Sequence, residues 1–109
     1  MKIKLKKYEA KEIEVDVEFP IYFKVNMMLD DADSYVFGKI TEDYLYTIRY
    51  EKYFRSEEVS YEVCKSKIKN LTFNGVADYL LPNNFNVFHI NESEFLAVKE
   101  KTLKFISEV

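Results

Sequence analysis

The side chains best suited to nucleophilic chemistry are scarce in this sequence. It contains one histidine, His89, and one cysteine, Cys64, and each lies in a short stretch that is predicted to be a strand. A Cys–His nucleophile would need these strands to be neighbours, and no spacing in the sequence brings them together. We therefore expect His89 to be a structural or partly exposed strand residue, and Cys64 to be buried and inert. No catalytic residue is predicted.

The acidic stretch Asp30–Ser34 could in principle bind a cation, because carboxylates are the usual ligands of calcium. Counted from Asp31, the twelfth position of a calcium loop is Glu42, but Val36 stands at the sixth, where the sharp turn needs glycine. One cysteine and one histidine cannot supply four zinc ligands, and two isolated glycines form no phosphate loop. We therefore predict a solvated acidic loop, no metal, no cofactor and no enzymatic activity.

Aromatic residues offer a binding chemistry instead. Tyr44, Tyr46 and Tyr50 recur at even spacing with Ile48, so they share one face of a predicted strand. Tyrosines on a sheet contribute large contact areas in protein interfaces, and they also stack on single-stranded bases. We predict these three tyrosines as protein-binding residues; the alternative is that they form the inward face beneath a helix.

Charge helps to choose between the two kinds of partner. The chain of 109 residues has 16 Lys and Arg against 19 Asp and Glu, so its formal net charge is −3. An acidic protein lacks much of the field that attracts a nucleic-acid backbone, and only Arg49 and Arg55 could make guanidinium contacts. We therefore expect a protein partner or self-association. Single-stranded nucleic-acid binding through an aromatic sheet face is the alternative.

The composition is that of a small globular protein. With 48% hydrophobic and 32% charged residues, positions 1–109 are expected to form a single domain with one core. No apolar run reaches the ~20 residues of a membrane span, and the lysine-rich start is not followed by the apolar region of a signal peptide, so we expect a cytoplasmic protein. The excess of Phe, Tyr, Ile, Asn and Lys over Gly, Ala, Arg and Pro is typical of AT-rich genomes. It favours a bacterium, a phage or a mobile element, where a small acidic protein could be an accessory or inhibitor.

Alternating residues predict a hairpin at the start of the chain. The stretches 2–6 and 12–19 each place apolar side chains on one face and charges on the other. If opposed positions sum to 18 around a turn at Tyr8–Ala10, Lys2 faces Asp16 and every lysine of the first strand faces an acid. Pro20 should then interrupt the pairing, after which the chain continues the strand or begins another.

The middle of the chain predicts further strands. The stretches Tyr35–Ile40 and Tyr44–Phe54 resemble a second hairpin, which follows a loop over Asn26–Ser34. Val59–Lys65 favours a strand, with a helix as the alternative, and Phe85–Ile90 also reads as a strand. Residues 66–84 are ambiguous, since Asn74-Gly75 suits a hairpin turn and the stretch after it suits a short helix.

The last 19 residues predict a helix. Asn91 and Glu94 have the spacing of a capping box, and three lysines lie towards the C-terminus, where the helix dipole favours cations. Its apolar face is predicted to consist of Phe95, Val98, Leu103 and Ile106. The expected fold is therefore α+β, an antiparallel meander sheet of five to seven strands with this amphipathic helix packed on one face. A small half-open β-barrel plus a helix is the alternative.

Overall fold

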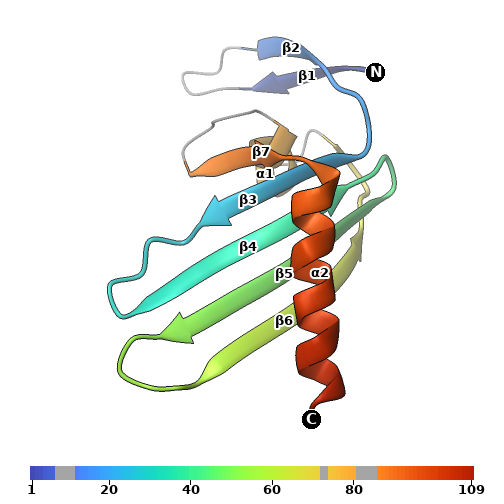
Figure 1. Cartoon of the computed structure of the whole chain (residues 1–109). Helices are drawn as coiled ribbons and strands as arrows, with labels where there is room; N and C mark the ends of the chain where they lie inside the picture. The colour runs from blue at the N-terminus through green and yellow to red at the C-terminus, as the bar shows by residue number, and fades with distance from the viewer. Residues whose placement is uncertain (7–11, 72–73, 81–85) are drawn as a thin grey trace.

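The computed structural model describes residues 1–6, 12–71, 74–80 and 86–109, and Figure 1 shows how they are arranged. The elements in chain order are β1 (Lys2–Lys6), β2 (Glu12–Asp16), β3 (Ile21–Asn26), β4 (Ala32–Ile40), β5 (Tyr44–Tyr53), β6 (Val59–Lys67), α1 (Asn74–Leu80), β7 (Val87–Ile90) and α2 (Glu92–Ser107). Strands β1 and β2 form one antiparallel sheet, and the other five form a second in the order β6-β5-β4-β3-β7. The described ranges contain no closed barrel, so the predicted α+β fold is confirmed.

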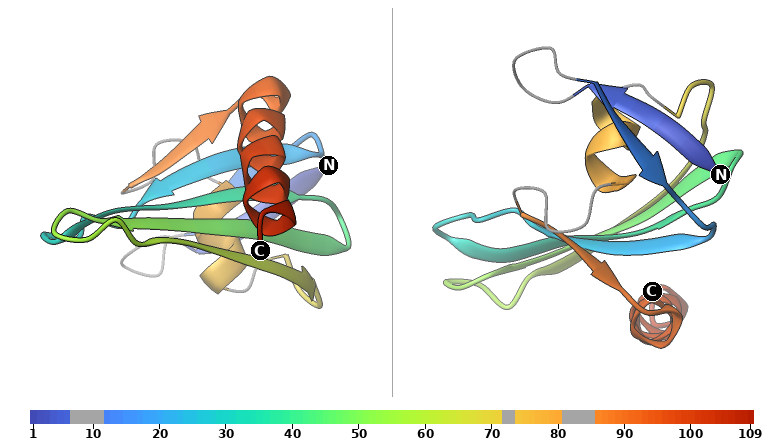
Figure 2. Two further views of the ribbon diagram at one scale, coloured as in Figure 1. Left: turned by 60° about the horizontal axis from the view of Figure 1, so that its bottom comes forward. Right: turned by 90° about the horizontal axis from the view of Figure 1, so that it is seen from above.

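The five-stranded sheet separates two layers. Seen from above in Figure 2, α1 and the β1–β2 hairpin lie on one side of this sheet, and α2 lies on the other. The buried residues that form one cluster come from the hairpin, the sheet and α1: Ile3, Val17, Ile21, Phe23, Ile40, Ala77, Leu80 and Val87. The main hydrophobic core therefore lies on the α1 side of the sheet, away from α2.

Phe23 is the centre of this core. Its side chain is 0% exposed, and its ring stacks on that of Tyr79 in α1 with 4.3 Å between the centroids. On its other side the ring lies against Gly38, the residue opposite it in β4, where an added Cβ would come within 2.0 Å of the ring. The absence of a side chain at Gly38 thus lets the aromatic ring pack directly on the sheet.

The predicted register of the first hairpin is confirmed. Lys2 lies opposite Asp16 and Lys4 lies opposite Glu14, so paired positions sum to 18. The ion pairs are shifted, because Lys2 Nζ lies 3.7 Å from Glu14 Oε1, and Asp16 meets the N-terminal ammonium at 3.4 Å. These pairs are exposed, and each contributes some tenths of a kcal/mol at most. The predicted turn at residues 8–10 lies outside the described residues.

Other predicted strands are confirmed with small changes in their bounds. Pro20 lies between β2 and β3, which begins as a new strand, and the Phe19–Pro20 peptide bond is cis. The predicted loop over Asn26–Ser34 is shorter than expected because β4 already begins at Ala32. The β6 stretch is a strand, whereas Asn74-Gly75 begins α1 instead of forming a hairpin turn.

Helix α2 begins as predicted, but only part of its predicted apolar face is buried. Asn91 Oδ1 accepts a hydrogen bond from the backbone N–H of Glu94 at 2.9 Å, as an N-cap should. Phe95 and Thr102 are the buried residues of α2, whereas Leu103 and Ile106 are exposed, so the prediction that these two belong to the buried face is wrong. Leu103 is rotated by about 80° around the helix axis from Phe95. Ile106 lies in the last turn, which Figure 1 shows extending past β6.

The expectations for Cys64 and His89 are partly corrected. Cys64 is exposed, so it is not the buried thiol that was predicted. It lies in β6 and His89 in β7, and these are the two opposite edges of the sheet, which excludes a Cys–His nucleophile. His89 Nε2 lies 2.9 Å from the carbonyl oxygen of Tyr79, so the histidine ties β7 to α1.

Candidate binding surfaces on the α2 side of the sheet

The three predicted tyrosines lie on the α2 side of the sheet. Because neighbouring residues of a strand point to opposite faces, residues opposed in register share one face. Three of the rows of opposed residues on the α2 side contain most of its aromatic side chains. They are the tyrosine row, Tyr35, Tyr50 and Tyr61; the apolar row, Phe37, Ile48 and Val63; and the tyrosine–lysine row, Tyr22, Lys39, Tyr46 and Lys65. The aromatic side chains are therefore ordered in lines that run across the strands.

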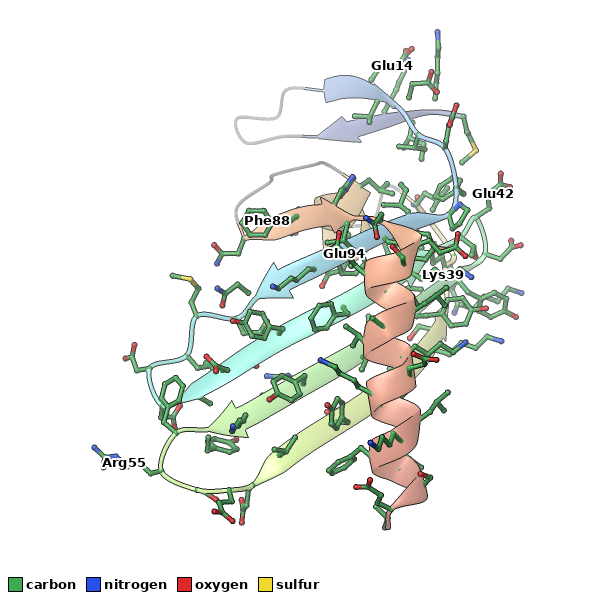
Figure 3. The ribbon with its side chains drawn as sticks, in the orientation of Figure 1. Glu14, Lys39, Glu42, Arg55, Phe88 and Glu94 are labelled. Atoms are coloured by element: carbon green, nitrogen blue, oxygen red, sulfur yellow. The ribbon has the colours of Figure 1, made fainter. Side chains whose placement is uncertain are left out.

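Helix α2 divides this face of the sheet into two flanks. Its first turn packs Phe95 on Tyr22 of β3, with ring centroids 5.4 Å apart, and its last turns pack Phe105 on Tyr61 of β6, at 4.8 Å. The helix therefore crosses from β3 to β6. Figure 3 shows side chains on the sheet on both sides of α2, with Lys39 on one side and Phe88 on the other.

The first flank is a groove of about 470 Å³, which we call the α2 groove. The tyrosine–lysine row lines it together with Val63, and its helical wall includes Leu96, Lys99, Leu103 and Ile106. Several of these apolar side chains face solvent: Val63 is 59% exposed, Leu103 56% and Ile106 52%. The groove thus combines an aromatic floor with an unburied aliphatic rim.

Lysines of the α2 groove lie over tyrosine rings. Lys65 Nζ is 4.4 Å from the ring centroid of Tyr44 and 5.5 Å from that of Tyr46, and Lys39 Nζ is 5.8 Å from the Tyr46 centroid. A cation over the face of an aromatic ring is attracted by the negative potential of the ring. Tyr44 and Tyr46 therefore hold a line of positive charge along the floor of the groove.

The second flank is a pocket of about 320 Å³, which we call the tyrosine pocket. Its lining residues are Lys24, Tyr35, Phe37, Tyr50, Tyr61, Val98 and Lys101. Lys24 Nζ lies 4.5 Å from the ring centroid of Tyr35, and the rings of Tyr50 and Tyr61 are 5.3 Å apart. Burial of Tyr61, and after it the nearby Tyr50, raise the pKa of the Tyr61 hydroxyl. The pocket is thus lined by four aromatic rings and two cations.

The distribution of charge over the sheet differs from that of the whole chain. On the α2 face of the five described strands, Asp33 is the one acid, and it lies opposite Lys52. The lysines on this face are Lys24, Lys39, Lys52, Lys65 and Lys67. The α2 face of the sheet is therefore basic although the formal net charge of the chain is −3.

Beyond Leu45, the opposite face of β5 is polar, and its carboxylate Glu51 is hydrogen-bonded within the chain. Glu51 accepts hydrogen bonds from Ser34 Oγ at 3.3 Å, from Arg49 Nε at 3.0 Å and from the Tyr53 hydroxyl at 3.1 Å. The hydrogen bond to Glu51 and the charge of that carboxylate raise the pKa of Tyr53. Since these partners occupy the carboxylate, Glu51 stabilises the contact between β4 and β5.

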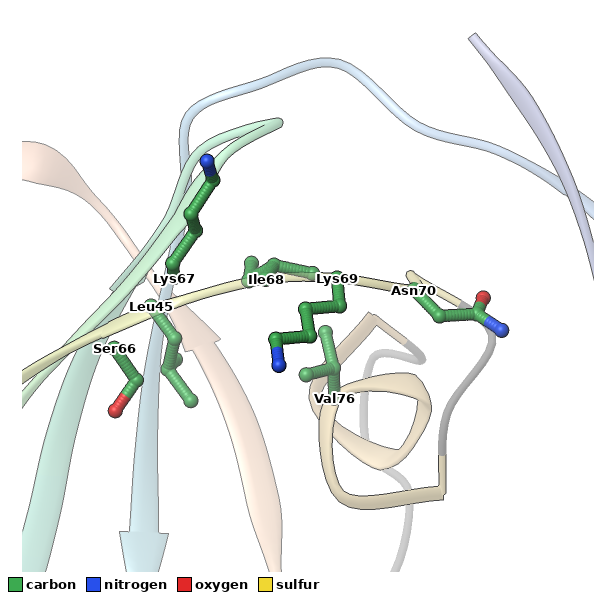
Figure 4. Close-up of a pocket in the computed structure, with 7 residues that line it drawn as sticks. All are labelled: Leu45, Ser66, Lys67, Ile68, Lys69, Asn70 and Val76. Carbon is green, nitrogen blue, oxygen red and sulfur yellow. The ribbon is translucent and has the colours of Figure 1, made fainter.

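A third pocket, of about 300 Å³, lies where the chain passes from β6 towards α1 (Figure 4). Leu45, Ile68 and Val76 give it an apolar lining, and Lys69 lies across from Val76. Lys67 extends away from this pocket, as its position on the α2 face of β6 requires. The pocket is therefore a small cavity at the junction between the sheet and α1.

The structure separates the three tyrosines that the sequence groups together. Tyr44, Tyr46 and Tyr50 do share one face, as predicted, but Tyr46 lines the α2 groove and Tyr50 lines the tyrosine pocket. Tyr44 lies beside the groove, in contact with Lys65. All three are partly buried, and their role in binding stays a prediction.

Sequence reasoning missed the lysines of these surfaces. Lys24, Lys39 and Lys65 stand two residues from an aromatic or apolar residue that shares their face, so the two-residue period contained the signal. Their role was hidden because each follows or precedes a hydrophobic residue of the opposite face. Only the register between strands shows that these lysines lie next to tyrosines.

Comparison with protein-family models, with curated proteins and with solved structures gives no match for this chain. Among the described residues, no group of three or more His, Cys, Asp or Glu side chains is arranged to hold a metal ion. Neither of the two helices in the described ranges has the length and apolar character that a membrane span requires.

Proposed function

We propose that this chain is a non-enzymatic protein-interaction module, that the α2 groove and the neighbouring edge of β6 form its binding surface, and that the partner is a second copy of the chain. The observation that supports the proposal is the cluster of exposed aliphatic side chains, Val63, Leu103 and Ile106, at one edge of the sheet. Exposed apolar residues that adjoin one another are typical of interaction surfaces.

The position of this cluster matters because β6 is an edge strand. Its nine residues from Val59 to Lys67 pair with β5 on one side only, and the strand contains no proline. An edge of this kind can accept another strand, with main-chain hydrogen bonds giving affinity and side chains giving specificity. A strand added here would lie beside Val63 and under the end of α2, so pairing and apolar burial would occur together.

The side chains of β6 favour a second copy as that partner. A two-fold axis at Val63 makes the two β6 strands antiparallel and continues each row of side chains into the second copy. Val63 then faces Val63 of the second copy, and Tyr61 faces Lys65, which repeats the tyrosine–lysine contacts within each chain. Glu62 faces Cys64, so this register opposes no like charges.

The experiment is sedimentation velocity over protein concentrations from about 1 to about 200 μM, because self-association depends on concentration. We expect a dimer whose dissociation constant rises at least tenfold, or about 1.4 kcal/mol, in Leu103→Asp. The matched control is Ala97→Asp, which makes the same change of charge on an exposed position of the same helix. It should leave the dimer unchanged.

The outcomes separate the parts of this proposal. A wild-type chain that stays monomeric throughout the concentration range contradicts self-association. Equal weakening by Leu103→Asp and Ala97→Asp contradicts the α2 groove as the interface. Val63→Asp provides a second variant on β6, and thermal unfolding of each variant shows whether a lost dimer reflects the surface or a lost fold.

A further inference from the structure

The tyrosine pocket has a different chemistry from the α2 groove. Two lysines and no acid are among its lining residues. Three of its aromatic rings are the tyrosine row on β4, β5 and β6, and the fourth is Phe37 of the apolar row. Val98 is its one aliphatic lining residue. A partner that buried aliphatic side chains here would meet rings and charges, whereas a flat, negatively charged ligand would meet both complementary features.

We propose that the tyrosine pocket binds single-stranded nucleic acid. Bases stack on aromatic side chains in a manner that depends little on sequence, and lysines neutralise the phosphates that connect the bases. Tyr35, Tyr50 and Tyr61 lie on adjacent strands about 4.8 Å apart, so successive rings line a path across β4, β5 and β6. Lys24 and Lys101 line the same pocket beside this path, one from the sheet and one from α2.

The net charge of the chain does not oppose this assignment. Most of the acids lie in the hairpin, the loops and the helices, while the α2 face of the strands has five lysines and Asp33. At ~0.15 M salt, charges more than about 8 Å from the ligand are largely screened, so the local lysines dominate. An acidic protein can therefore present a basic site.

The shape of the site selects single strands over duplex. Its rings belong to side chains that lie on a sheet beside a helix, and Tyr61 packs against Phe105 of that helix. Paired bases inside a duplex cannot reach such rings, whereas unstacked bases can be turned towards them. Phe88, which is 48% exposed at the edge strand β7 and opposite Lys24, extends the aromatic surface beyond the pocket.

The experiment is a fluorescence polarisation titration of the full chain with labelled dT and U oligonucleotides of about 12 residues. We expect a dissociation constant below ~10 μM at low salt that weakens as salt rises. Lys24→Glu/Lys101→Glu should weaken binding at least tenfold at ~0.15 M salt. Lys39→Glu/Lys99→Glu makes the same change of charge in the α2 groove and should change binding less than threefold.

Three outcomes would contradict the proposal. Absence of binding at low salt contradicts the site, and equal losses in the two double variants show attraction of polyanions without a site. Equal affinity for a duplex of the same length contradicts base stacking.

Two further variants separate the role of the rings from that of the fold and of the dimer. Tyr50→Ala should weaken binding while circular dichroism stays unchanged. Leu103→Asp should retain nucleic-acid binding, so a failure here is distinct from a failure of the dimer.

Discussion

The two flanks of α2 use the same aromatic residue in different surroundings. In the α2 groove, Tyr46 lies between lysines and beneath an aliphatic wall that ends in Leu103 and Ile106. In the tyrosine pocket, Tyr50 lies between two other tyrosines, and the nearby cations are not accompanied by an aliphatic wall. Only three residues separate Tyr46 from Tyr50 along β5, yet the two tyrosines belong to surfaces with different chemistry.

The difference shows that neighbours across the strands, and not the residue type, define what a tyrosine can bind. Aliphatic neighbours on a helix favour a partner that buries apolar area. Aromatic neighbours with lysines in the same pocket favour stacked rings joined by phosphates. Helix α2 creates the distinction, because it lies over the buried Ile48 at the middle of the apolar row and leaves tyrosines on each side.

The largest expected effect comes from a substitution in the hydrophobic core, which supports the sheet beneath both flanks. Phe23→Ala empties the centre of the core on the other side of the sheet and should lower the free energy of unfolding by about 3–5 kcal/mol. Urea denaturation followed by circular dichroism measures this change. Phe88→Ala, on the exposed edge of the same sheet, is the control and should cost well below half as much. Equal losses would show that Phe23 is not the centre of the core.

A pair of single substitutions tests whether the flanks act separately. Tyr46→Asp should weaken self-association about tenfold, or about 1.4 kcal/mol, and Tyr50→Asp should weaken oligonucleotide binding by a similar factor. Each variant is measured in both sedimentation and polarisation assays. If each tyrosine affects only its own assay, the division by α2 is supported. If both variants lose both activities and keep their melting temperatures, the two flanks form one surface.

A smaller effect is expected from loosening the helix that separates the flanks. Asn91→Ala removes the side chain that accepts the hydrogen bond of Glu94 N–H and should destabilise α2 by about 0.5–2 kcal/mol. Because α2 borders both surfaces, both activities should fall together. Asn91→Asp keeps an acceptor at the cap and should restore both. A loss confined to one activity would show that only one surface depends on the position of α2.

The smallest effect sharpens the description of the tyrosine pocket. Burial raises the pKa of Tyr61 above its ordinary value of 10.0, so the folded chain keeps this proton at pH values where the unfolded chain has lost it. The resulting stabilisation is present below pH 10 and is lost as the pH rises through the folded pKa. Because the pKa values of Tyr22 and Tyr53 are also raised, ultraviolet titration of the wild type and of Tyr61→Phe should show one fewer late-ionising tyrosine in the variant. An unchanged titration would contradict this burial.

Local patterns in the sequence predicted most of the elements. Alternation limited the first hairpin to registers of even sum, and the opposed charges indicated the register that is observed. The cap at Asn91 marked the start of α2, and all these signals depend on residues close together in the chain. The wrong prediction for Leu103 has a physical cause. Thr102 packs against the sheet with its hydroxyl bonded to the carbonyl of Val98 at 2.8 Å, so a polar residue takes the inward position.

The candidate surfaces were only partly predictable. The parity of residues along β5 placed Tyr44, Tyr46 and Tyr50 on one face, but the path of α2 between them depends on contacts such as Phe105 with Tyr61, which are far apart in the sequence. The lysine contacts likewise depend on pairing between strands. Net charge, a property of the whole chain, concealed a basic face that only the three-dimensional arrangement reveals.

The close approach of Phe23 to Gly38 has an evolutionary consequence. A side chain at position 38 and a ring at position 23 compete for the same space, so the two positions should vary together among homologous chains. Lineages that keep the ring should keep the glycine, and lineages that replace the ring with a small residue become free to change position 38. This paired pattern would let distant homologues be recognised where overall sequence similarity has been lost.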